Sequence, residues 1–373
     1  MSEPVRILEV VNVMDRAGLE AMLMNHYRAI DRSRVQLDFL EHRPWEGAYE
    51  EEIRSLGGRV FRAPRLYPQN CFAYRRFMRQ FFSEHDYPVV HSHIDAMSAF
   101  PLAEARKAGV PVRIAHSHND SVDRDIRYPI KMVARRRLPG IATHYWACSE
   151  AAGRFLFGDQ NAGRIHVVKN AIDLSRFRFG DEARSELRAA LGVGRGQLLV
   201  GHVGRFSAVK NHAFLVELLA ELRTEGVDAQ LALVGDGELR HEVEQQASGK
   251  ALADRVHFLG LRDDVPRLMS AFDILVFPSL HEGIPLTLIE AQASGLPVLT
   301  SDKVSAESLI LPHTARLSLD APLVEWASQT LALAQSGREA DPTPALTAAG
   351  YEIHASARGL MESYLALYEE AVR

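Results

Sequence analysis

Short apolar runs alternate with longer segments of helical periodicity along most of this 373-residue chain. Near-continuous apolar runs suit the strands of a parallel sheet, because helices bury both faces of such a sheet. A strand followed by a helix, repeated, predicts an α/β fold of the doubly wound type. In the first half we expect strands at Val5–Val11, Val35–Leu40, Arg59–Ala63, Val89–His93, Val112–Ala115 and His144–Cys148. The helices expected between them include Leu19–Ile30, Tyr74–Phe82, Ala96–Ala108 and Glu150–Phe157.

The same alternation of strand and helix patterns begins again near residue 197. The stretch before it interrupts the pattern several times, and we interpret it as a hinge near 170–195. The second set of strands is expected at Gln197–Val203, Gln230–Val234, Val256–Leu259, Ile274–Phe277 and Pro297–Thr300. The helices between them are expected at about 211–224, 238–247, 264–271 and 286–294. We therefore predict two Rossmann-like domains, 1–175 and 176–352, and an amphipathic helix at 353–373 that can pack back on the first domain. Two such domains facing each other would place a central cleft at the carboxyl ends of their strands, where ligands bind in these folds.

Composition excludes several classes of protein. No apolar run approaches the roughly 20 residues that span a bilayer, and the first residues lack the pattern of a signal peptide. The two cysteines, Cys71 and Cys148, have no spacing typical of a zinc site or a disulfide framework. A formal net charge of −5 gives no support for nucleic-acid binding. We expect a cytoplasmic protein.

The segment from Glu282 to Glu290 carries the strongest local signal. It follows the apolar run Ile274–Phe277, and Pro285 suits the first turn of a helix, where its missing N–H costs nothing. Free N–H groups in that turn, together with the helix dipole, can hold an anion. A carboxylate such as Glu282 or Glu290 can accept hydrogen bonds from two hydroxyl groups of a ribose or another sugar. By spacing alone, two solvated glutamates are the better explanation of the pair, but the position after an apolar run and the Gly283-Ile284-Pro285 turn reverse this preference.

A second candidate is the loop that follows the expected strand Gln197–Val203. Gly204 ends this strand at a point where a ligand can approach the backbone closely. Arg205 and Lys210 then place two cations ahead of a helix, where they could neutralise a diphosphate. This is not a Walker A loop, because the final Gly-Lys-Ser/Thr is missing. A third candidate, Gly235–Glu238, is also explained by a turn and a helix cap.

These motifs occur in a fixed order, and together they resemble the retaining GT-B glycosyltransferases of family four. The matching segments run over about 100 residues of the second half: Gly204-Arg205 with Lys210-Asn211, Val234–Gly237, Phe258–Gly260, Phe277–Ser279, Glu282 and Glu290, and Ala291–Val298. The resemblance implies a metal-independent transfer of a sugar from a nucleotide-diphosphate donor, most often a UDP-sugar, with no cofactor. It is closest to transferases of surface or exopolysaccharide assembly, which implies a glycan or a lipid-linked acceptor.

The resemblance also implies roles for individual residues. Arg205 and Lys210 would contact the donor diphosphate, Glu282 the donor sugar and Glu290 the ribose. The base would lie near Gly260, Leu261 and Arg262, and the backbone of Gly283, Ile284, Pro285 and Leu286 would line the phosphates and the sugar. Gly18 and Gly204 would allow the donor to approach the backbone. The family's Gly-Gly turn is here Ala17-Gly18, which makes the approach at position 17 tighter.

Histidines follow two neighbouring strands of the first half. His91 and His93 share a face of one strand by alternation, and a strand that ends near Ser92 would free His93 to enter the cleft. The resemblance implies a role for His93 at the donor sugar or the acceptor, and His116, His118 and Asn119 repeat the arrangement after the next strand. A buried structural histidine is the alternative. Four histidines could indicate a metal, but no carboxylate or cysteine stands nearby at ligand spacing, so we predict none.

A basic cluster follows these histidines. Arg127, Lys131 and Arg135 would share one face of a helix, and the whole cluster comprises Arg124, Arg127, Lys131, Arg135, Arg136 and Arg137. Such a face attracts anionic lipid head groups or the phosphate of a lipid-linked acceptor, which would make the protein peripheral on the inner face of the membrane. A solvated helix face explains the cluster equally well. Asp123-Arg124-Asp125 matches the DxD metal signature of another glycosyltransferase fold, but we interpret this as coincidence because that fold's context is missing.

Two other functions remain open from the sequence. A nucleotide-sugar 2-epimerase shares the two-domain fold and would convert the donor without transferring the sugar. A non-catalytic protein that binds nucleotide-sugars is the other alternative, although the joint presence of Glu282, Arg205, Lys210 and His93 favours an enzyme.

Overall fold

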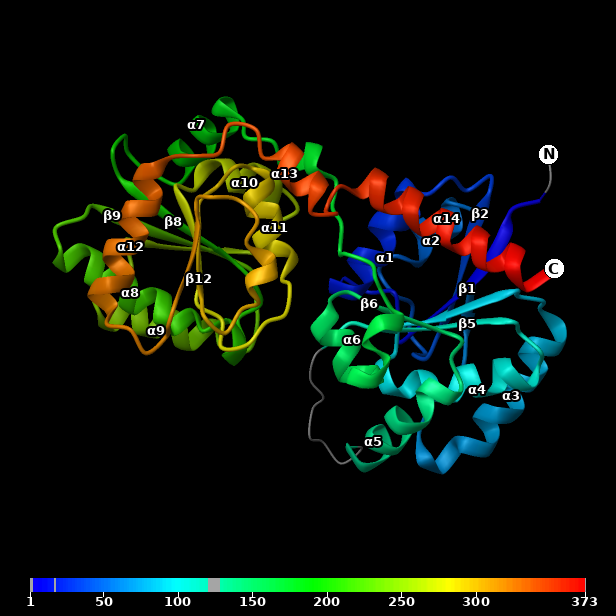
Figure 1. Ribbon diagram of the computed structural model, residues 1–373. Coiled ribbons are helices and arrows are strands. Elements are labelled where there is room, and N and C mark those ends of the chain that lie inside the picture. The colour runs from blue at the N-terminus through cyan, green and yellow to red at the C-terminus, as the bar shows by residue number, and fades with distance from the viewer. Residues whose placement is uncertain (1–2, 17, 120–127, 373) are drawn as a thin grey trace. The chain divides into compact units, whose positions relative to one another are not determined.

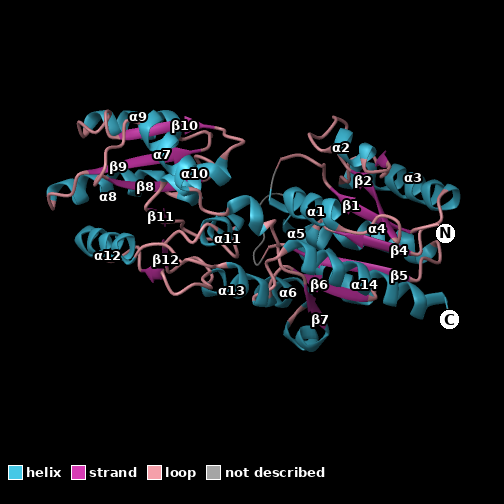
Figure 2. Cartoon of the chain, turned by 90° about the horizontal axis from the view of Figure 1, so that it is seen from above, coloured by secondary structure: helices cyan, strands magenta, loops and turns pink. Residues whose placement is uncertain are grey.

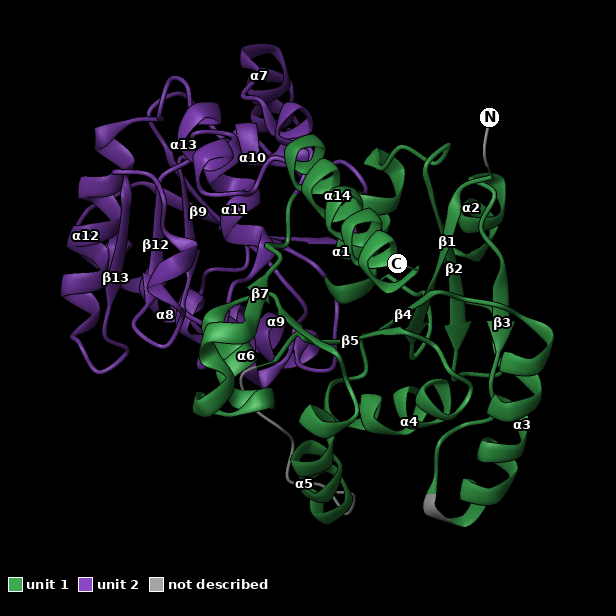
Figure 3. Ribbon diagram, turned by 45° about the vertical axis from the view of Figure 1, so that its right-hand side comes forward, with its two compact units in different colours: residues 1–171, 353–373 green, residues 172–352 purple. Residues whose placement is uncertain are grey.

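The computed structural model describes residues 3–16, 18–119 and 128–372 and divides the chain into two compact units. Unit 1 comprises Met1–Ala171 and Ile353–Arg373, and unit 2 comprises Ile172–Glu352 (Figure 3). The change from unit 1 to unit 2 falls inside the stretch 170–195 where the breaks in the sequence indicated a hinge. The C-terminal helix α14, Ile353–Val372, packs against α1, Gly18–Ala29, of unit 1 (Figure 1).

Unit 1 is built on a parallel sheet of seven strands in the order β3-β2-β1-β4-β5-β6-β7. The strands are β1 Val5–Val11, β2 Val35–Glu41, β3 Val60–Arg62, β4 Val89–Ser92, β5 Val112–Ser117, β6 His144–Ala147 and β7 Ile165–Val167. Besides α1 and α14, its helices are α2 Glu50–Ser55, α3 Cys71–Glu84, α4 Ala99–Lys107, α5 Tyr128–Arg137 and α6 Glu150–Phe157.

Both faces of this sheet are buried, which explains the continuous apolar strands. Alternate residues of β1 enter different cores: Ile7 packs with residues of α1 and α14, whereas Leu8 packs with residues of α3 and α4. Figure 2 shows the helices that flank the strands. All paired strands are parallel, so their carboxyl ends, including those of β4 and β5, meet at one edge of the sheet.

Unit 2 repeats the plan with a parallel sheet of six strands in the order β10-β9-β8-β11-β12-β13. Its strands are β8 Leu198–Val203, β9 Ala229–Val234, β10 Val256–Gly260, β11 Ile274–Phe277, β12 Val298–Ser301 and β13 Thr314–Leu317. Its helices are α7 Asp181–Ala190, α8 His212–Thr224, α9 Arg240–Gly249, α10 Val265–Ala271, α11 Leu286–Ala293, α12 Leu323–Ser336 and α13 Thr343–Ala348. Because β8 and β11 are neighbours, the loops that follow them leave the sheet side by side.

The two doubly wound α/β sheets confirm the predicted fold class. The prediction missed the edge strands β7 and β13, whose residues are only partly buried or exposed and therefore form no continuous apolar run. It also placed the start of a helix at Ala96. There the chain enters a 3₁₀ turn, Asp95–Ser98, through Asp95 with a positive φ of 46°, and the α-helix begins only at Ala99.

Candidate active site

The loops after β8 and β11 bring Lys210 and Glu282 together. The Nζ atom of Lys210 lies 2.6 Å from Oε1 of Glu282 and 4.5 Å from the centre of the Phe277 ring. Both side chains keep about a fifth of their surface exposed, at 19% and 21%. The backbone of Glu282 is fixed by a parallel bridge to Val304. The pair is therefore a positioned cation and a positioned carboxylate that a ligand can still reach.

Small residues leave room beside this pair. A Cβ atom at Gly204 would lie 3.1 Å from Nε2 of His202, which is a tight contact, and 3.4 Å from Cδ of Lys210. Gly235, at the end of β9, has a φ of 135°, and a Cβ there would collide with the carbonyl oxygen of Gly204. Gly283, next to Glu282, has open space where a Cβ would stand. The glycines of two predicted motifs thus meet at one place on the sheet edge.

Arg205 does not join Lys210 at Glu282. Its guanidinium lies 3.1 Å from Oε2 of Glu238, and its side chain is 74% exposed. A surface ion pair of this kind contributes little to stability. Arg205 is therefore held by a weak partner that an incoming anion can replace.

Helix α11 begins directly after Pro285, which has an extended conformation and serves as the N-cap. Glu290 lies in the second turn of this helix. Burial raises the pKa of Glu290 to about 7, while the nearby charge of Arg176 acts in the opposite direction. Its carboxyl group therefore keeps its proton to a higher pH than an exposed glutamate does, and hydrogen bonds from a ligand's hydroxyl groups would favour the charged form.

The predicted base-binding segment lies at the end of β10. Gly260 closes this strand with a φ of 66°, and the side chain of Leu261 is 82% exposed. Arg262 forms two hydrogen bonds of 2.7 Å to the carboxylate of Asp264. An exposed apolar side chain beside the sheet edge suits contact with a flat base, and the assignment stays a prediction.

Four histidines of unit 1 form a cluster at the carboxyl ends of β4 and β5: His91, His93 and His116, which are buried, and His118, which is half-buried. Nε2 of His91 lies 3.1 Å from Nδ1 of His116, and Nδ1 of His93 lies 2.9 Å from Nε2 of His118. Strand β4 ends at Ser92, one residue before the predicted end at His93, yet His93 is only 2% exposed and is not free to enter a cleft. Its position is set by Glu9 of β1, whose Oε2 lies 2.7 Å from His93 Nε2.

Glu9 and Tyr364 complete the cluster, and the sequence interpretation missed both. The hydroxyl of Tyr364, from α14, donates to Oε1 of Glu9 at 2.8 Å and lies 2.6 Å from Nδ1 of His91. A signal for Glu9 existed, because it is the one charged residue inside the apolar run Ile7–Val11. No sequence signal connects Tyr364 to residues more than 270 positions away.

The hydrogen bonds and the pKa values together indicate which atom of each group in the cluster carries a proton. Burial raises the pKa of Glu9 to about 8 and lowers the pKa of His93 to about 3, so both groups are neutral at pH 7. Protonated Glu9 then donates to His93 Nε2, and His93 donates from Nδ1 to His118. Since Tyr364 donates to Glu9, His91 donates to the Tyr364 oxygen and accepts from His116. This assignment leaves Nε2 of His116 as a buried acceptor without a partner.

The expectation that no carboxylate lies near the histidines was wrong, because Glu9 lies within hydrogen-bond distance of His93. Among the described residues, ligand atoms of His91, His93 and His116 fall within 4.8 Å of one another. In the network above, however, the nitrogens of His91 and His93 all engage neighbouring side chains. The absence of a required metal stays a prediction.

Asn119 and the backbone N–H of His118 both bind the carboxylate of Asp95, at 2.8 and 3.2 Å. These bonds tie the loop after β5 to the turn after β4. Gly18 begins α1 with open space where a Cβ would stand, whereas Ala17 lies outside the described residues.

The predicted basic face is only partly described. Lys131, Arg135, Arg136 and Arg137 lie on α5, and the guanidinium of Arg135 stands 4.6 Å from the centre of the Phe155 ring. Arg124, Arg127 and the DxD segment lie outside the described residues. Within the described residues, no helix is long and apolar enough to cross a membrane.

We expect Glu9→Gln to weaken the pH dependence of stability. In the folded protein the pKa of Glu9 is about 8, against an ordinary value of 4.5, so between these values the folded state holds a proton that the unfolded state has lost. The free energy of unfolding therefore falls as pH rises from about 5 to 8. Loss of the Glu9 proton accounts for a few kcal/mol of this fall, at about 1.4 kcal/mol per pKa unit. Glutamine can make the same two hydrogen bonds and does not titrate.

The measurement is the melting temperature of unit 1 between pH 5 and 8. Glu9→Gln should show a smaller decline than the unaltered protein, with Glu51→Gln, at an exposed position of α2, as the control. An equally steep decline in Glu9→Gln and the control would show that Glu9 is not protonated in the fold.

Two doubly wound parallel sheets, each with predicted site residues at the carboxyl ends of its strands, define the class of protein as a GT-B glycosyltransferase, and comparisons with known proteins give the family. Residues 16–176 match the profile of Glycosyltransferase Family 4, and residues 197–335 match that of Glycosyl transferases group 1. The chain is 43% identical over 340 residues to EpsF of Bacillus subtilis (strain 168), covering 89% of this chain and 88% of EpsF. The name of EpsF gives a glycosyltransferase class without a substrate. The chain belongs to glycosyltransferase family 4 and is a glycosyltransferase.

More distant relatives differ in their donors. A GDP-mannose-dependent phosphatidylinositol monomannoside mannosyltransferase of Mycobacterium tuberculosis (strain ATCC 25618 / H37Rv) is 26% identical and covers 93% of each chain. Among solved structures, HepE of Anabaena in complex with UDP superposes with a TM-score of 0.73 at 20% identity, covering 99% of this chain and 98% of HepE. At this identity the likeness shows the fold alone.

Proposed function

We propose that this enzyme transfers a sugar from a UDP-sugar to a glycan or lipid-linked acceptor in surface or exopolysaccharide synthesis, with retention and without a metal. The observation that carries the proposal is the Lys210–Glu282 pair beside the glycines of the sheet edge. A UDP donor is supported by the fold shared with HepE, which was solved with UDP and with UDP-glucose. A lipid-linked acceptor is supported by a 29% identical Escherichia coli galactosyltransferase that acts on a sugar linked to diphosphoundecaprenol and covers 58% of each chain.

The mechanism follows from the movement of charge. When the bond between sugar and phosphate breaks, positive charge develops on the sugar and negative charge on the diphosphate. Lys210, with Arg205 released from Glu238 and the N-terminus of α11, would stabilise the departing diphosphate in the role that Mg²⁺ has in other enzymes. Glu282 would bind hydroxyl groups of the donor sugar, and Glu290 those of the ribose.

Unit 1 would supply the acceptor side. His93, placed by Glu9, would bind the acceptor or the donor sugar by exchanging its hydrogen bond to Nε2 of His118 for one to a hydroxyl group of the ligand. His116, His118 and Asn119 would shape the same edge. Retention would follow if the acceptor hydroxyl attacks from the face that the diphosphate leaves, with the leaving phosphate taking its proton. We place no covalent intermediate in this scheme.

A panel of nucleotides tests the donor assignment. UDP and UDP-sugars should raise the melting temperature of unit 2 more than GDP, ADP and their sugars, because at equal concentration the ligand with the lowest Kd stabilises the fold most. A ligand at 100 times its Kd adds about 2.7 kcal/mol to the free energy of unfolding. A larger shift with GDP-sugars would contradict the choice of base. Product analysis completes the test, since an epimerase would yield an isomeric donor without release of the nucleoside diphosphate.

A further inference from the structure

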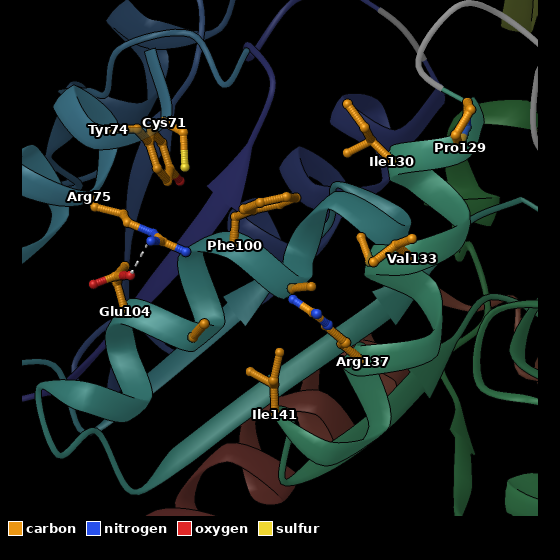
Figure 4. A pocket seen from close by; sticks show the side chains of 13 residues that line it. Cys71, Tyr74, Arg75, Phe100, Glu104, Pro129, Ile130, Val133, Arg137 and Ile141 are labelled. Carbon is orange, nitrogen blue, oxygen red and sulfur yellow. Dashed lines mark ion pairs between the residues drawn. The ribbon is translucent and has the colours of Figure 1, made fainter. Parts of the chain in front are cut away.

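An apolar pocket lies between α3, α4 and α5 of unit 1 and contains none of the residues assigned above to the donor or the histidine cluster. Its volume is about 330 Å³, which falls in the range of pockets that hold small molecules. Figure 4 shows side chains from the three helices that point into it. The apolar wall includes Tyr74, Phe100, Ala103, Ile130, Val133 and Ile141.

The pocket wall presents mainly apolar surface to a ligand. The hydroxyl of Tyr74 is already bound to His42 Nε2 at 2.9 Å, so this residue presents its ring. Apolar surface continues outward, because Val133 is 52% exposed and Phe72, at the start of α3, is 85% exposed. A hydrocarbon chain that enters the pocket from outside would cover this exposed surface.

Positive charge is in excess at the pocket. Glu104 is a buried carboxylate, and three cations surround it: Lys107 at 2.7 Å, Arg75 at 3.6 Å and Arg79 at 3.6 Å. Arg137 also lines the pocket, is exposed, and has no ion pair among the described residues. Arg136 adds a further exposed cation on α5. One carboxylate cannot neutralise these groups, so the site suits a ligand with an apolar chain and an anionic end.

We propose that this pocket binds the hydrocarbon chain of a prenyl phosphate or diphosphate lipid, whose phosphate lies at Arg137. A free phosphate would leave the apolar wall unused, and a purely apolar ligand would leave the cations unused. The inference rests on the proposed function in one respect: the lipid would be the carrier of the acceptor sugar. It extends that function by naming the chemistry of the carrier and the place where the carrier binds.

The test is binding of farnesyl diphosphate to the full chain, by calorimetry, with saturating UDP to occupy the donor site. Farnesyl diphosphate should bind at least about tenfold more tightly than inorganic diphosphate, which corresponds to about 1.4 kcal/mol. Ala103→Trp fills the pocket and should weaken this binding about tenfold or more. Ala73→Trp places the same side chain on an exposed position of α3 and should leave the binding unchanged.

Equal affinities for farnesyl diphosphate and inorganic diphosphate would overturn the proposal, as would unchanged binding in folded Ala103→Trp. If that variant does not fold, Arg137→Glu replaces an exposed side chain and should weaken the binding through its charge; unchanged binding there would overturn the phosphate position. Binding of UDP is measured in the same samples. If UDP binds normally but farnesyl diphosphate binds no more tightly than inorganic diphosphate, the lipid pocket is refuted and the proposed transferase function is not affected.

Discussion

Lys210→Ala is expected to lower kcat for sugar transfer by about 100- to 1,000-fold, the cost typical of removing one group that stabilises developing negative charge. Lys210 is the cation that the loop after β8 holds against Glu282, at 2.6 Å. When the diphosphate departs, this ammonium group would stand where its negative charge forms. The affinity for UDP should fall as well, because the same cation binds the diphosphate in the ground state.

The measurement compares kcat and the Kd of UDP in Lys210→Ala and in Lys250→Ala. Lys250 belongs to the same unit and pairs with Glu217 at 2.8 Å on the surface, so its removal is a control for the loss of a positive charge. A near-normal kcat in Lys210→Ala would remove this residue from the diphosphate role.

Glu282→Ala should produce a different result, a fall in kcat of about 100-fold or more with little change in the affinity for UDP. UDP has no donor sugar, so it would not use the carboxylate that we assign to the sugar hydroxyls. Loss of the carboxylate also frees Lys210 from its ion pair, which would favour UDP rather than weaken it. Lys210→Ala thus tests the contact with the diphosphate, and Glu282→Ala tests the contact with the donor sugar, although the two residues form one ion pair.

Titration with UDP and with the UDP-sugar checks this difference, with Glu325→Ala at an exposed position of α12 as the control. Glu282→Ala should lose affinity for the UDP-sugar relative to UDP. A parallel loss for both ligands would instead place Glu282 at the nucleotide, and a normal kcat would exclude it from the reaction.

The fold could be predicted from sequence because burial on both faces gives the central strands an unbroken apolar character. Val5–Val11 and Ile274–Phe277 are central strands, and their predicted bounds agree with the structure. The edge strands Ile165–Val167 and Thr314–Leu317 were missed because their side chains are partly exposed. Helix α2 was also missed, since a segment of six residues shows too little periodicity to be detected.

The candidate site could be predicted to a different extent in each unit. Lys210 and Glu282 follow parallel strands that are neighbours in the sheet. The loops after such strands lie at the same sheet edge, so the contact between the two residues could be expected from the order of the motifs. The partner of Arg205, Glu238, depends on side-chain directions that the sequence does not specify. The contact of Tyr364 with Glu9 joins residues 355 positions apart and arises only when α14 packs on unit 1. The burial of His93 follows from this tertiary contact rather than from local pattern.

The most direct test of metal-independent sugar transfer is the rate at which the nucleoside diphosphate is released from the preferred nucleotide-sugar, with and without excess EDTA. A polyprenyl-diphosphate-linked monosaccharide serves as acceptor, and slow transfer to water provides a second readout. If Lys210, Arg205 and the start of α11 stabilise the leaving group, both rates should be unchanged by EDTA. Loss of activity in EDTA that added Mg²⁺ restores would contradict the account.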